Sequence, residues 1–431
     1  MCTRMSQVLQ VIRKLCSGNY LSSGNISDGA SSGTIAHDCH TDQKMGHSTS
    51  GKKKSTEAVC RKLEQYLEPF LEEGIIEYMD CPDYIDPEYN YERPLSVFWE
   101  VTYACNQDCP HCTSKARTFD PRELTQEEID EAIDQLIELE VGLISITGGE
   151  PLLKKDTVLQ IAQRTSEHGI ELELLTNGMF ITPEAAEVIY CAGIRDAQVS
   201  LDCAQPDVHD RQRGFEGAWK ETVEGIHNLR KAGIHVMASA VMNSETLEYF
   251  DETKRFLQTI ADTFKIEAVK PAGQELNNML SPDLYYKLLE LRNMREGQLS
   301  EFIFFKERCS IGTTPVITPT GDVYPCIFTK YEELRLGNVR KTSLGDIYEY
   351  SDTLSELLEC TVDKIKSCRD CWNRYYCGGG CRGCAFEHYK TIYSPDPYQC
   401  EARKKFARKL LRHGHPLTKK ALRELVMLAK N

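Results

Sequence analysis

The sequence predicts an α/β protein whose first domain is a partial (βα)6 barrel of the TIM-like type. Two observations lead to this prediction. Between Leu95 and about Gly273, six short apolar runs alternate with segments of helical periodicity. After about residue 300 the alternation stops, and cysteines, glycines and turn residues dominate. Strands that alternate with helices form a parallel sheet with right-handed crossovers. Six such units are too few for the closed eight-stranded barrel, so we expect an open one.

The first helix of this domain is the most clearly marked element. Thr125 and Glu128 have the spacing of a capping box, and apolar residues at Ile129, Ile133, Leu136 and Ile137 share one helical face. Strands are expected at residues 95–102, 143–147, 172–176, 197–201, 235–242 and 266–270, and the other helices at 155–167, 183–191, 216–232 and 245–260. In such a barrel the functional side chains gather at the carboxyl ends of the strands.

Composition and charge limit the function. The chain has 431 residues, of which 41% are hydrophobic and 27% charged, and it contains no apolar run long enough to span a membrane. Its first twenty residues lack the apolar core of a signal peptide, so we expect a cytoplasmic protein. The net charge of −14 argues against nucleic-acid binding. Nineteen cysteines in a large chain of this kind indicate metal binding or catalysis rather than disulfides.

The composition divides the chain into five segments. Residues 1–56 are expected to be disordered, because they are mostly rich in small and polar residues. Residues 57–94 are expected to form a small packing or recognition element, and residues 95–300 the barrel. A second domain is placed at 301–401, where metal clusters would supply the order that apolar periodicity does not. Residues 402–431 are expected to form a basic C-terminal helix.

Three cysteines follow the first strand. Cys105, Cys109 and Cys112 have the spacing C-x3-C-x2-C. Because a four-iron cluster takes four ligands, three thiolates leave one iron with an open position, which is typical of a catalytic metal. A zinc site is the alternative. It is less favoured, because no fourth Cys or His follows closely except His111, which lies inside the loop.

This loop resembles that of the radical SAM enzymes, and three further motifs agree. The sequence GGEP closes the second strand, TNG closes the third, and SLDCAQPDVHDRQRG resembles the family's fourth-strand segment. The resemblance implies that S-adenosylmethionine binds through Gly148, Gly149, Glu150, Asn177, Ser200, Asp202 and Arg213.

Within that set, the resemblance assigns the methionine amino group of S-adenosylmethionine to the GGEP turn and its carboxylate to Arg213. Because glycine has no side chain, Gly148 and Gly149 also allow backbone amides to approach a ligand closely. Two positions depart from the family pattern: Cys203 stands where glycine is usual, and His111 where an aromatic residue commonly packs on adenine.

A second set of cysteines fills the C-terminal part of the chain. Its pattern is C-x11-G-x4-C, then C-x2-C-x5-C-x3-C, then a last cysteine. It resembles the SPASM extension of peptide-modifying radical SAM enzymes; a pair of zinc ribbons is the alternative. The resemblance implies that auxiliary cluster I is bound by Cys309, Cys326 and Cys381, and auxiliary cluster II by Cys368, Cys371, Cys377 and Cys400.

The fourth ligand of auxiliary cluster I is left open by the sequence. Either Cys384 completes the cluster, or one iron keeps an open position that could bind a substrate thiolate. Cys191 and Cys360 lack ligand spacing, and we expect both to be buried as small apolar residues.

The resemblance implies a reaction and its requirements. These are three [4Fe-4S] clusters, reductive cleavage of S-adenosylmethionine to a 5′-deoxyadenosyl radical, an electron donor such as flavodoxin or ferredoxin, and oxidative modification of a substrate. A ribosomally made precursor peptide is expected as substrate, with a thioether, a carbon–carbon crosslink or a decarboxylation as outcome. The first strand and its loop also resemble the mycofactocin peptide maturases, which oxidise and crosslink a peptide's C-terminus. Two alternatives remain: an enzyme acting on a small molecule such as a tetrapyrrole, and a non-enzymatic iron–sulfur electron carrier.

Overall fold

The structure is a computed structural model that describes residues 93–114, 118–271, 279–295, 298–299 and 306–429. The predictions for residues 1–56, and for all but the last two residues of 57–94, fall outside this range.

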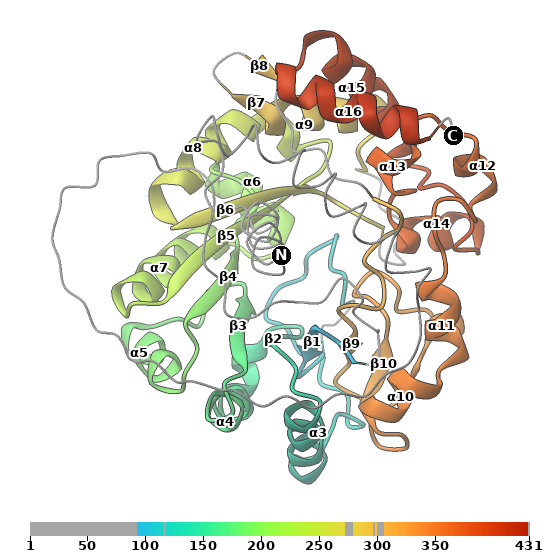
Figure 1. Cartoon of the computed structure of the whole chain (residues 1–431). Helices are drawn as coiled ribbons and strands as arrows, with labels where there is room; N and C mark the ends of the chain where they lie inside the picture. The colour runs from blue at the N-terminus through green and yellow to red at the C-terminus, as the bar shows by residue number, and fades with distance from the viewer. Residues whose placement is uncertain (1–92, 115–117, 272–278, 296–297, 300–305, 430–431) are drawn as a thin grey trace, which may run out of the picture. The chain divides into compact units, whose positions relative to one another are not determined.

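A parallel sheet forms the centre of the first domain (Figure 1). Its strands run in the order in which they occur along the chain, and each pairs in parallel with the next. They are β1 (Ser96–Glu100), β2 (Leu143–Thr147), β3 (Glu171–Thr176), β4 (Asp196–Ser200), β5 (His235–Met242) and β6 (Thr263–Ala268). Among the described residues β6 has no strand beyond it, so the sheet does not close. The predicted partial barrel is confirmed.

Helices cover the outer side of this sheet (Figure 1). They are α3 (Gln126–Glu138), α4 (Lys155–Ser166), α5 (Pro183–Cys191), α7 (Ala218–Lys231) and α8 (Phe250–Ile260). The predicted capping box starts α3: the Thr125 hydroxyl accepts from the Glu128 amide at 3.4 Å, and the Glu128 carboxylate accepts from the Thr125 amide at 2.8 Å. Two 3-10 turns, η1 (Pro151–Lys154) and η2 (Thr246–Tyr249), precede α4 and α8. A short helix that the sequence analysis missed, α6 (Pro206–Arg213), lies inside the fourth-strand motif.

The sheet continues beyond β1 into the cysteine-rich segment, which the sequence analysis did not predict. Strand β9 (Val316–Ile317) pairs in parallel with β1, with Phe98 opposite Val316. Strands β10 (Asp322–Tyr324) and β11 (Gly337–Asn338) follow in antiparallel pairing, so the described part of the sheet has nine strands. The backbone between Cys309 and Cys326 is therefore anchored to the barrel by hydrogen bonds.

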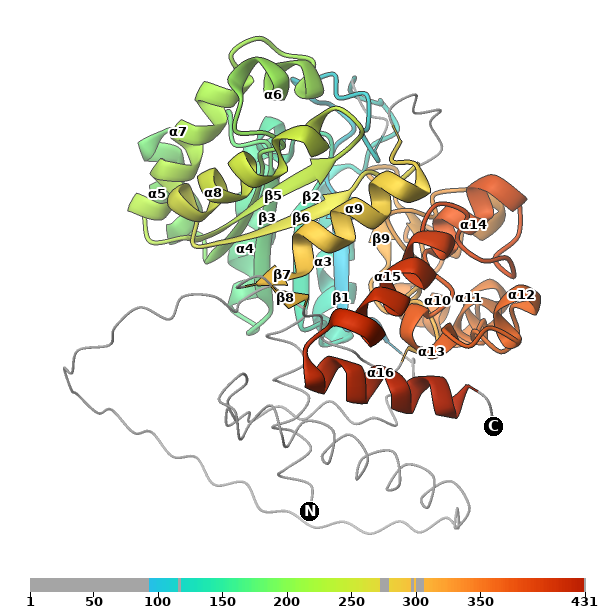
Figure 2. The same cartoon turned by 90° about the horizontal axis from the view of Figure 1, so that it is seen from above.

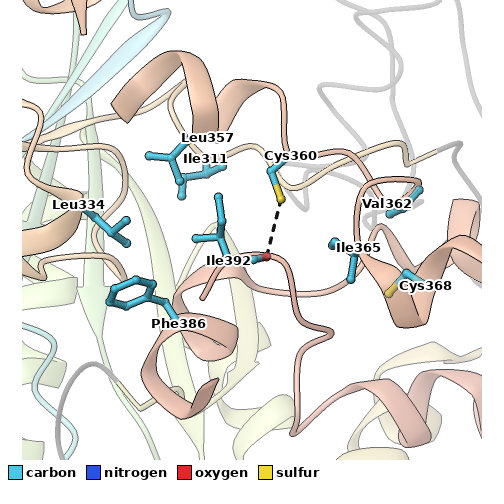
Figure 3. Close-up of a cluster of buried hydrophobic side chains, with 9 residues drawn as sticks. All are labelled: Ile311, Leu334, Leu357, Cys360, Val362, Ile365, Cys368, Phe386 and Ile392. Atoms are coloured by element: carbon cyan, nitrogen blue, oxygen red, sulfur yellow. Dashed lines mark hydrogen bonds between the residues drawn. The ribbon is translucent and has the colours of Figure 1, made fainter. Parts of the chain in front are cut away.

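The remainder of the cysteine-rich segment is helical and packs around its own apolar cluster (Figure 3). The elements are η3 (Glu332–Leu334), α10 (Leu344–Tyr350), α11 (Asp352–Leu358), α12 (Lys366–Arg369), α13 (Arg374–Cys377) and α14 (Arg382–Tyr389). The buried cluster contains Ile311, Leu334, Leu357, Cys360, Val362, Ile365, Cys368, Phe386 and Ile392. Cys360 is buried as predicted, and its thiol contacts the Ile392 carbonyl at 3.6 Å. The same prediction for Cys191 is wrong: this residue is exposed, because it lies on the outward face of the last turn of α5.

The basic tail forms two helices rather than one. Helix α15 (Cys400–His413) begins at the last cysteine of the ligand pattern and runs beside α9 (Pro282–Asn293), as Figure 2 shows. The chain turns after Gly414, and α16 (Pro416–Leu428) starts with a proline, which cannot continue a helix from the preceding turn. Two short strands, β7 (Met294–Arg295) and β8 (Gln298–Leu299), follow α9. None of the helices in the described ranges has the length and apolar character needed to cross a bilayer.

Candidate active site and cysteine clusters

The three-cysteine loop lies directly after β1, at the carboxyl end of the sheet. Cys109 is 8% exposed, and burial raises the pKa of its thiol to about 11, although the nearby Arg213 opposes this. Burial also raises the pKa of the Cys105 thiol, and the charge of Cys112 contributes to the increase at both Cys105 and Cys109. A hydrogen bond from the Cys112 amide to the Cys109 carbonyl, at 3.1 Å, closes the loop.

The GGEP turn after β2 packs against the strand that leads into this loop. The Gly149 amide donates to the Thr102 carbonyl at 2.6 Å, and the Glu150 amide to the Ala104 carbonyl at 2.8 Å. A Cβ atom on Gly149 would lie 2.1 Å from the Ala104 oxygen. The structure gives a reason for this glycine that the sequence analysis did not anticipate: its amide approaches the backbone that leads into the cysteine loop. The turn positions the loop.

Glu150 is fully buried and connects β2 to β3. Its carboxylate accepts hydrogen bonds from the Asn177 amide at 2.9 Å, the Thr176 hydroxyl at 2.8 Å and the Leu152 amide at 3.1 Å. Burial raises the pKa of Glu150 to about 7, and these hydrogen bonds limit the increase. The Asn177 side chain in turn donates to Asn106, inside the cysteine loop, at 2.7 Å.

The segment after β4 contacts the same loop through a buried ion pair. Arg213 Nη2 lies 2.9 Å from Asp202 Oδ2, and the two side chains are 9% and 0% exposed. Arg213 Nη1 lies 3.9 Å from the Cys109 sulfur, and His111 Nε2 lies 3.4 Å from Asp202 Oδ2. Burial alone would oppose ionisation of Asp202, but the charges of Arg213 and His111 hold its pKa below the usual range.

These contacts bring together the residues that the sequence analysis assigned to S-adenosylmethionine. These residues lie at or beyond the carboxyl ends of the parallel strands. They are Gly148–Glu150 after β2, Asn177 after β3, Ser200 and Asp202 at and after the end of β4, and Arg213 at the end of the helix that follows β4. Two buried nitrogen atoms there, Arg213 Nε and His209 Nε2, have no hydrogen-bond partner in the protein. Unsatisfied buried donors and acceptors of this kind fit a site that takes a polar ligand.

The second cysteine set forms two groups in space. The first contains Cys309, Cys326 and Cys381. Burial raises the pKa of Cys326 to about 12, and the charges of Cys309 and Cys381 add to this effect. Cys384, which is 1% exposed, donates a hydrogen bond to Cys381 and lowers the pKa of that thiol to about 6; Lys270 acts in the same direction. The structure therefore places Cys384 beside Cys381.

Lys270 was missed by the sequence analysis. It follows β6 directly, and its ammonium group lies 4.2 Å from the ring centre of Phe328, two residues after Cys326. Burial would lower its pKa, but the charges of Cys381, Glu267, Cys384 and Cys326 outweigh this and raise it. The expectation that functional residues end the strands could have identified it, because it is the last residue of the sixth apolar run.

The second group contains Cys368, Cys371, Cys377 and Cys400. The four residues line one cavity of about 170 Å³, together with Asn373 and others. Burial raises the pKa of Cys368 to about 12, and the charges of Cys377, Cys400 and Cys371 contribute. Four thiols around one enclosed space are a donor set that fits a [4Fe-4S] cluster.

Among the side chains of the described ranges, no group of three or more His, Cys, Asp or Glu has the arrangement of a single-ion site.

A pocket of about 170 Å³ lies between the cysteine loop and the segment after Cys326. Its lining includes Tyr103, Ser114, Tyr324, Phe328, Lys330 and Tyr331. Lys330 Nζ and the Ser114 hydroxyl both lie 2.6 Å from Glu100 Oε1, at the end of β1. This buried contact fixes the cysteine-rich segment against the strand that precedes the three-cysteine loop.

An open parallel barrel with three cysteines after its first strand, followed by two further cysteine groups, defines a radical SAM enzyme with auxiliary iron–sulfur sites. Comparison with known families agrees. The radical SAM superfamily profile matches residues 99–257, and the profile of the iron–sulfur cluster-binding domain SPASM matches residues 309–372. The chain belongs to the radical SAM enzymes and contains a SPASM domain. This finding sets aside the alternative of a non-enzymatic electron carrier.

Several characterised relatives are similar over most of the chain. The mycofactocin maturase MftC of Mycolicibacterium smegmatis is 28% identical, covering 72% of this chain and 83% of the relative. The AdoMet-dependent heme synthase of Methanosarcina barkeri is 27% identical, covering 71% of this chain and 96% of the relative. Among solved structures, native anSMEcpe with bound AdoMet superposes with a TM-score of 0.61 at 19% identity, over 78% of this chain and 100% of that chain. This last likeness supports the fold.

Proposed function

We propose that this enzyme cleaves S-adenosylmethionine reductively and oxidatively modifies a ribosomally made precursor peptide. One observation supports the reaction class: the three-cysteine loop contacts the buried Asp202–Arg213 pair at the carboxyl end of the sheet. A cluster held by the three cysteines would have its open position beside a polar ligand site there, as the reaction requires.

In this proposal Cys105, Cys109 and Cys112 hold the catalytic cluster. Glu150 accepts a hydrogen bond from the amino group of S-adenosylmethionine. Arg213 Nε, which has no hydrogen-bond partner in the protein, donates a hydrogen bond to the carboxylate of S-adenosylmethionine. The bound cofactors supply a 5′-deoxyadenosyl radical that takes hydrogen from an unactivated carbon. The protein orients the target, and the walls of the adjoining pocket exclude water.

The two remaining cysteine groups would hold two auxiliary clusters, for three [4Fe-4S] clusters in total. Auxiliary cluster I would lie near the aromatic pocket, because Phe328 and Tyr331 follow Cys326 and line it. An oxidative outcome releases a further electron after hydrogen abstraction, and clusters held by these two cysteine groups would be able to accept it. The reducing electron for the catalytic cluster would come from a small donor protein such as flavodoxin or ferredoxin.

The substrate assignment rests on similarity to the mycofactocin maturase and on the SPASM pattern, which is typical of peptide-modifying enzymes. The second candidate is a small molecule of the tetrapyrrole class. It is favoured by the similarity to a heme synthase, which extends over 96% of that relative's length.

The reaction class can be tested with the anaerobically reconstituted protein. We expect about twelve irons per chain, which corresponds to three cubanes, and 5′-deoxyadenosine after addition of dithionite and S-adenosylmethionine. A variant with Cys105, Cys109 and Cys112 changed to Ala should lose about four irons and all cleavage while keeping the auxiliary clusters. Intact cleavage by this variant would refute the catalytic assignment.

The substrate class can be tested by mass spectrometry. The enzyme is incubated either with a precursor peptide encoded beside its gene or with a free tetrapyrrole. The peptide proposal predicts loss of two hydrogens, or of carbon dioxide together with two hydrogens, from the peptide, with one 5′-deoxyadenosine formed for each hydrogen abstraction. Turnover of the tetrapyrrole without any peptide would establish the second candidate instead.

A further inference from the structure

Asn373 is a buried amide whose side chain has no partner in the protein. It lies between two candidate cluster ligands, Cys371 and Cys377, and is 1% exposed. Both its Nδ2 and Oδ1 atoms are buried, and neither makes a hydrogen bond. Because a buried amide without a partner carries a free-energy cost, an unpaired amide inside a native fold indicates a missing partner.

The local backbone does not explain this asparagine. Asn373 stands immediately before α13, at the position where an asparagine side chain ordinarily accepts a hydrogen bond from the first turn of the helix. Here it makes no such bond, and only its backbone carbonyl takes part, accepting from the Cys377 amide at 3.0 Å. The side chain is therefore available for another role.

The side chain lines the cavity formed by the second cysteine group. That cavity of about 170 Å³ is bordered by Cys368, Cys371, Cys377 and Cys400. Two cationic neighbours on its wall are already paired: Lys404 lies 3.0 Å from Glu401, and Arg374 lies 2.8 Å from Asp363. Asn373 differs from both, because it is neutral and has no protein partner.

We propose that Asn373 Nδ2 donates a hydrogen bond to a sulfur atom of the cluster held by Cys368, Cys371, Cys377 and Cys400, and so raises its reduction potential. The inference rests on the proposed function, which places auxiliary cluster II in this cavity. Reduction adds negative charge to a cluster, and a hydrogen bond to sulfur stabilises the reduced form more than the oxidised form. Asn373 would thereby make the cluster a better electron acceptor without taking part in the reaction itself.

The test compares Asn373→Leu, which keeps the volume and removes the donor, with Asn373→Asp, which keeps the shape and replaces the amino group by oxygen. Both are made in the background of the Cys105, Cys109 and Cys112 alanine variant, so that only auxiliary clusters remain. Ser367→Ala is the matched control, because Ser367 lines the same cavity but is exposed. Iron content and redox titrations followed by electron paramagnetic resonance are the readouts.

We expect full cluster content and a lower midpoint potential for one cluster. A change of about tenfold in its reduction equilibrium corresponds to about 59 mV for one electron. The other cluster and the Ser367→Ala control should keep their potentials. If the Leu variant does not retain its clusters, the proton coupling of the Asp variant decides the outcome, because a carboxylate charge beside the cluster lowers the potential by itself. In the wild-type background, the reduced cluster should also show an exchangeable proton coupling that the Leu or Asp variant lacks.

Absence of the cluster and absence of the hydrogen bond give different results. If the parent protein with intact Asn373 holds no cluster in this cavity, the proposed cluster count is wrong and the inference falls with it. If the cluster is present but its potential and proton coupling are unchanged in the Asp variant, the hydrogen bond alone is refuted.

Discussion

Arg213 Nη2 lies 2.9 Å from Asp202 Oδ2, and this buried ion pair connects the segment after β4 to the three-cysteine loop. The backbone reinforces the connection, because the Asp108 amide donates to the Arg213 carbonyl at 3.0 Å. The fourth strand thus contributes to the position of the metal ligands that follow the first.

Replacing Asp202 should destabilise the protein strongly. In Asp202→Ala the guanidinium of Arg213 stays buried without its counter-charge, and breaking a buried pair in this way costs about 3–5 kcal/mol. Asp207→Ala is the matched control: it removes an exposed partner of Arg211, from a pair whose side chains are 76% and 55% exposed, and such pairs contribute about 0.3–0.5 kcal/mol. Urea unfolding of the two cluster-free variants measures the difference. Equal unfolding midpoints would contradict the role of the pair.

Much of the barrel could be predicted because its residues carry a periodic signal. Apolar runs such as 143–147 mark strands of a parallel sheet, and Thr125 with Glu128 marks the start of α3. Once the strands were assigned, the expectation that functional residues lie at their carboxyl ends placed the motifs on one edge of the sheet. The structure brings them together there.

The parts that could not be predicted lack such a signal. Strands β9 and β11 have two residues each, too few to show an alternation, and β9 pairs with β1, which is distant in the sequence. No spacing pattern in the sequence identifies Asn373 as a site residue, because its proposed role depends on the cavity that it lines. The exposure of Cys191 depends on which way the last turn of α5 faces, which composition does not reveal.

Gly149 should tolerate no side chain. In Gly149→Ala the new Cβ atom would lie 2.1 Å from the Ala104 oxygen, so the backbone before Cys105 must move. We expect the catalytic cluster to be lost or unstable, with about four irons fewer per chain, while the auxiliary clusters remain. Gly345→Ala is the control, because a Cβ atom there would meet only ordinary contacts, the nearest at 3.5 Å. Iron content and 5′-deoxyadenosine formation measure both. An active Gly149→Ala enzyme would show that the turn does not position the loop.

Cys384 is predicted to complete auxiliary cluster I, because its buried thiol contacts Cys381. Cys384→Ala should then lose about four irons per chain, or hold a damaged cluster with an altered resonance spectrum. Cys360→Ala provides the comparison: Cys360 is 2% exposed and lies in the apolar cluster of the same domain, without ligand spacing. It should keep all its iron. Full and spectrally unchanged clusters in Cys384→Ala would favour the other possibility, an open iron in auxiliary cluster I.

Glu150 should make the protein without cofactors less stable as the pH rises. Burial raises the pKa of this carboxyl from 4.5 to about 7. Between these values the folded protein holds a proton that the unfolded chain has released, so the stability falls with increasing pH and levels off above about pH 7. At about 1.4 kcal/mol for each pKa unit, the loss is about 3 kcal/mol across this window.

Glu150→Gln removes this titration, so its unfolding free energy should decline less than that of the wild type between about pH 5 and 8. The variant also places an amide nitrogen near hydrogen-bond donors, so the test is the difference in pH slope rather than the absolute stability. Urea unfolding of both proteins across this range measures the slopes. Glu184→Gln is the control: Glu184 is exposed, and hydrogen bonds from its own amide and from Thr182 lower its pKa, so it is ionised in both states across this range and its removal should leave the slope unchanged. Parallel curves for Glu150→Gln and the wild type would mean that Glu150 is already ionised in the folded protein.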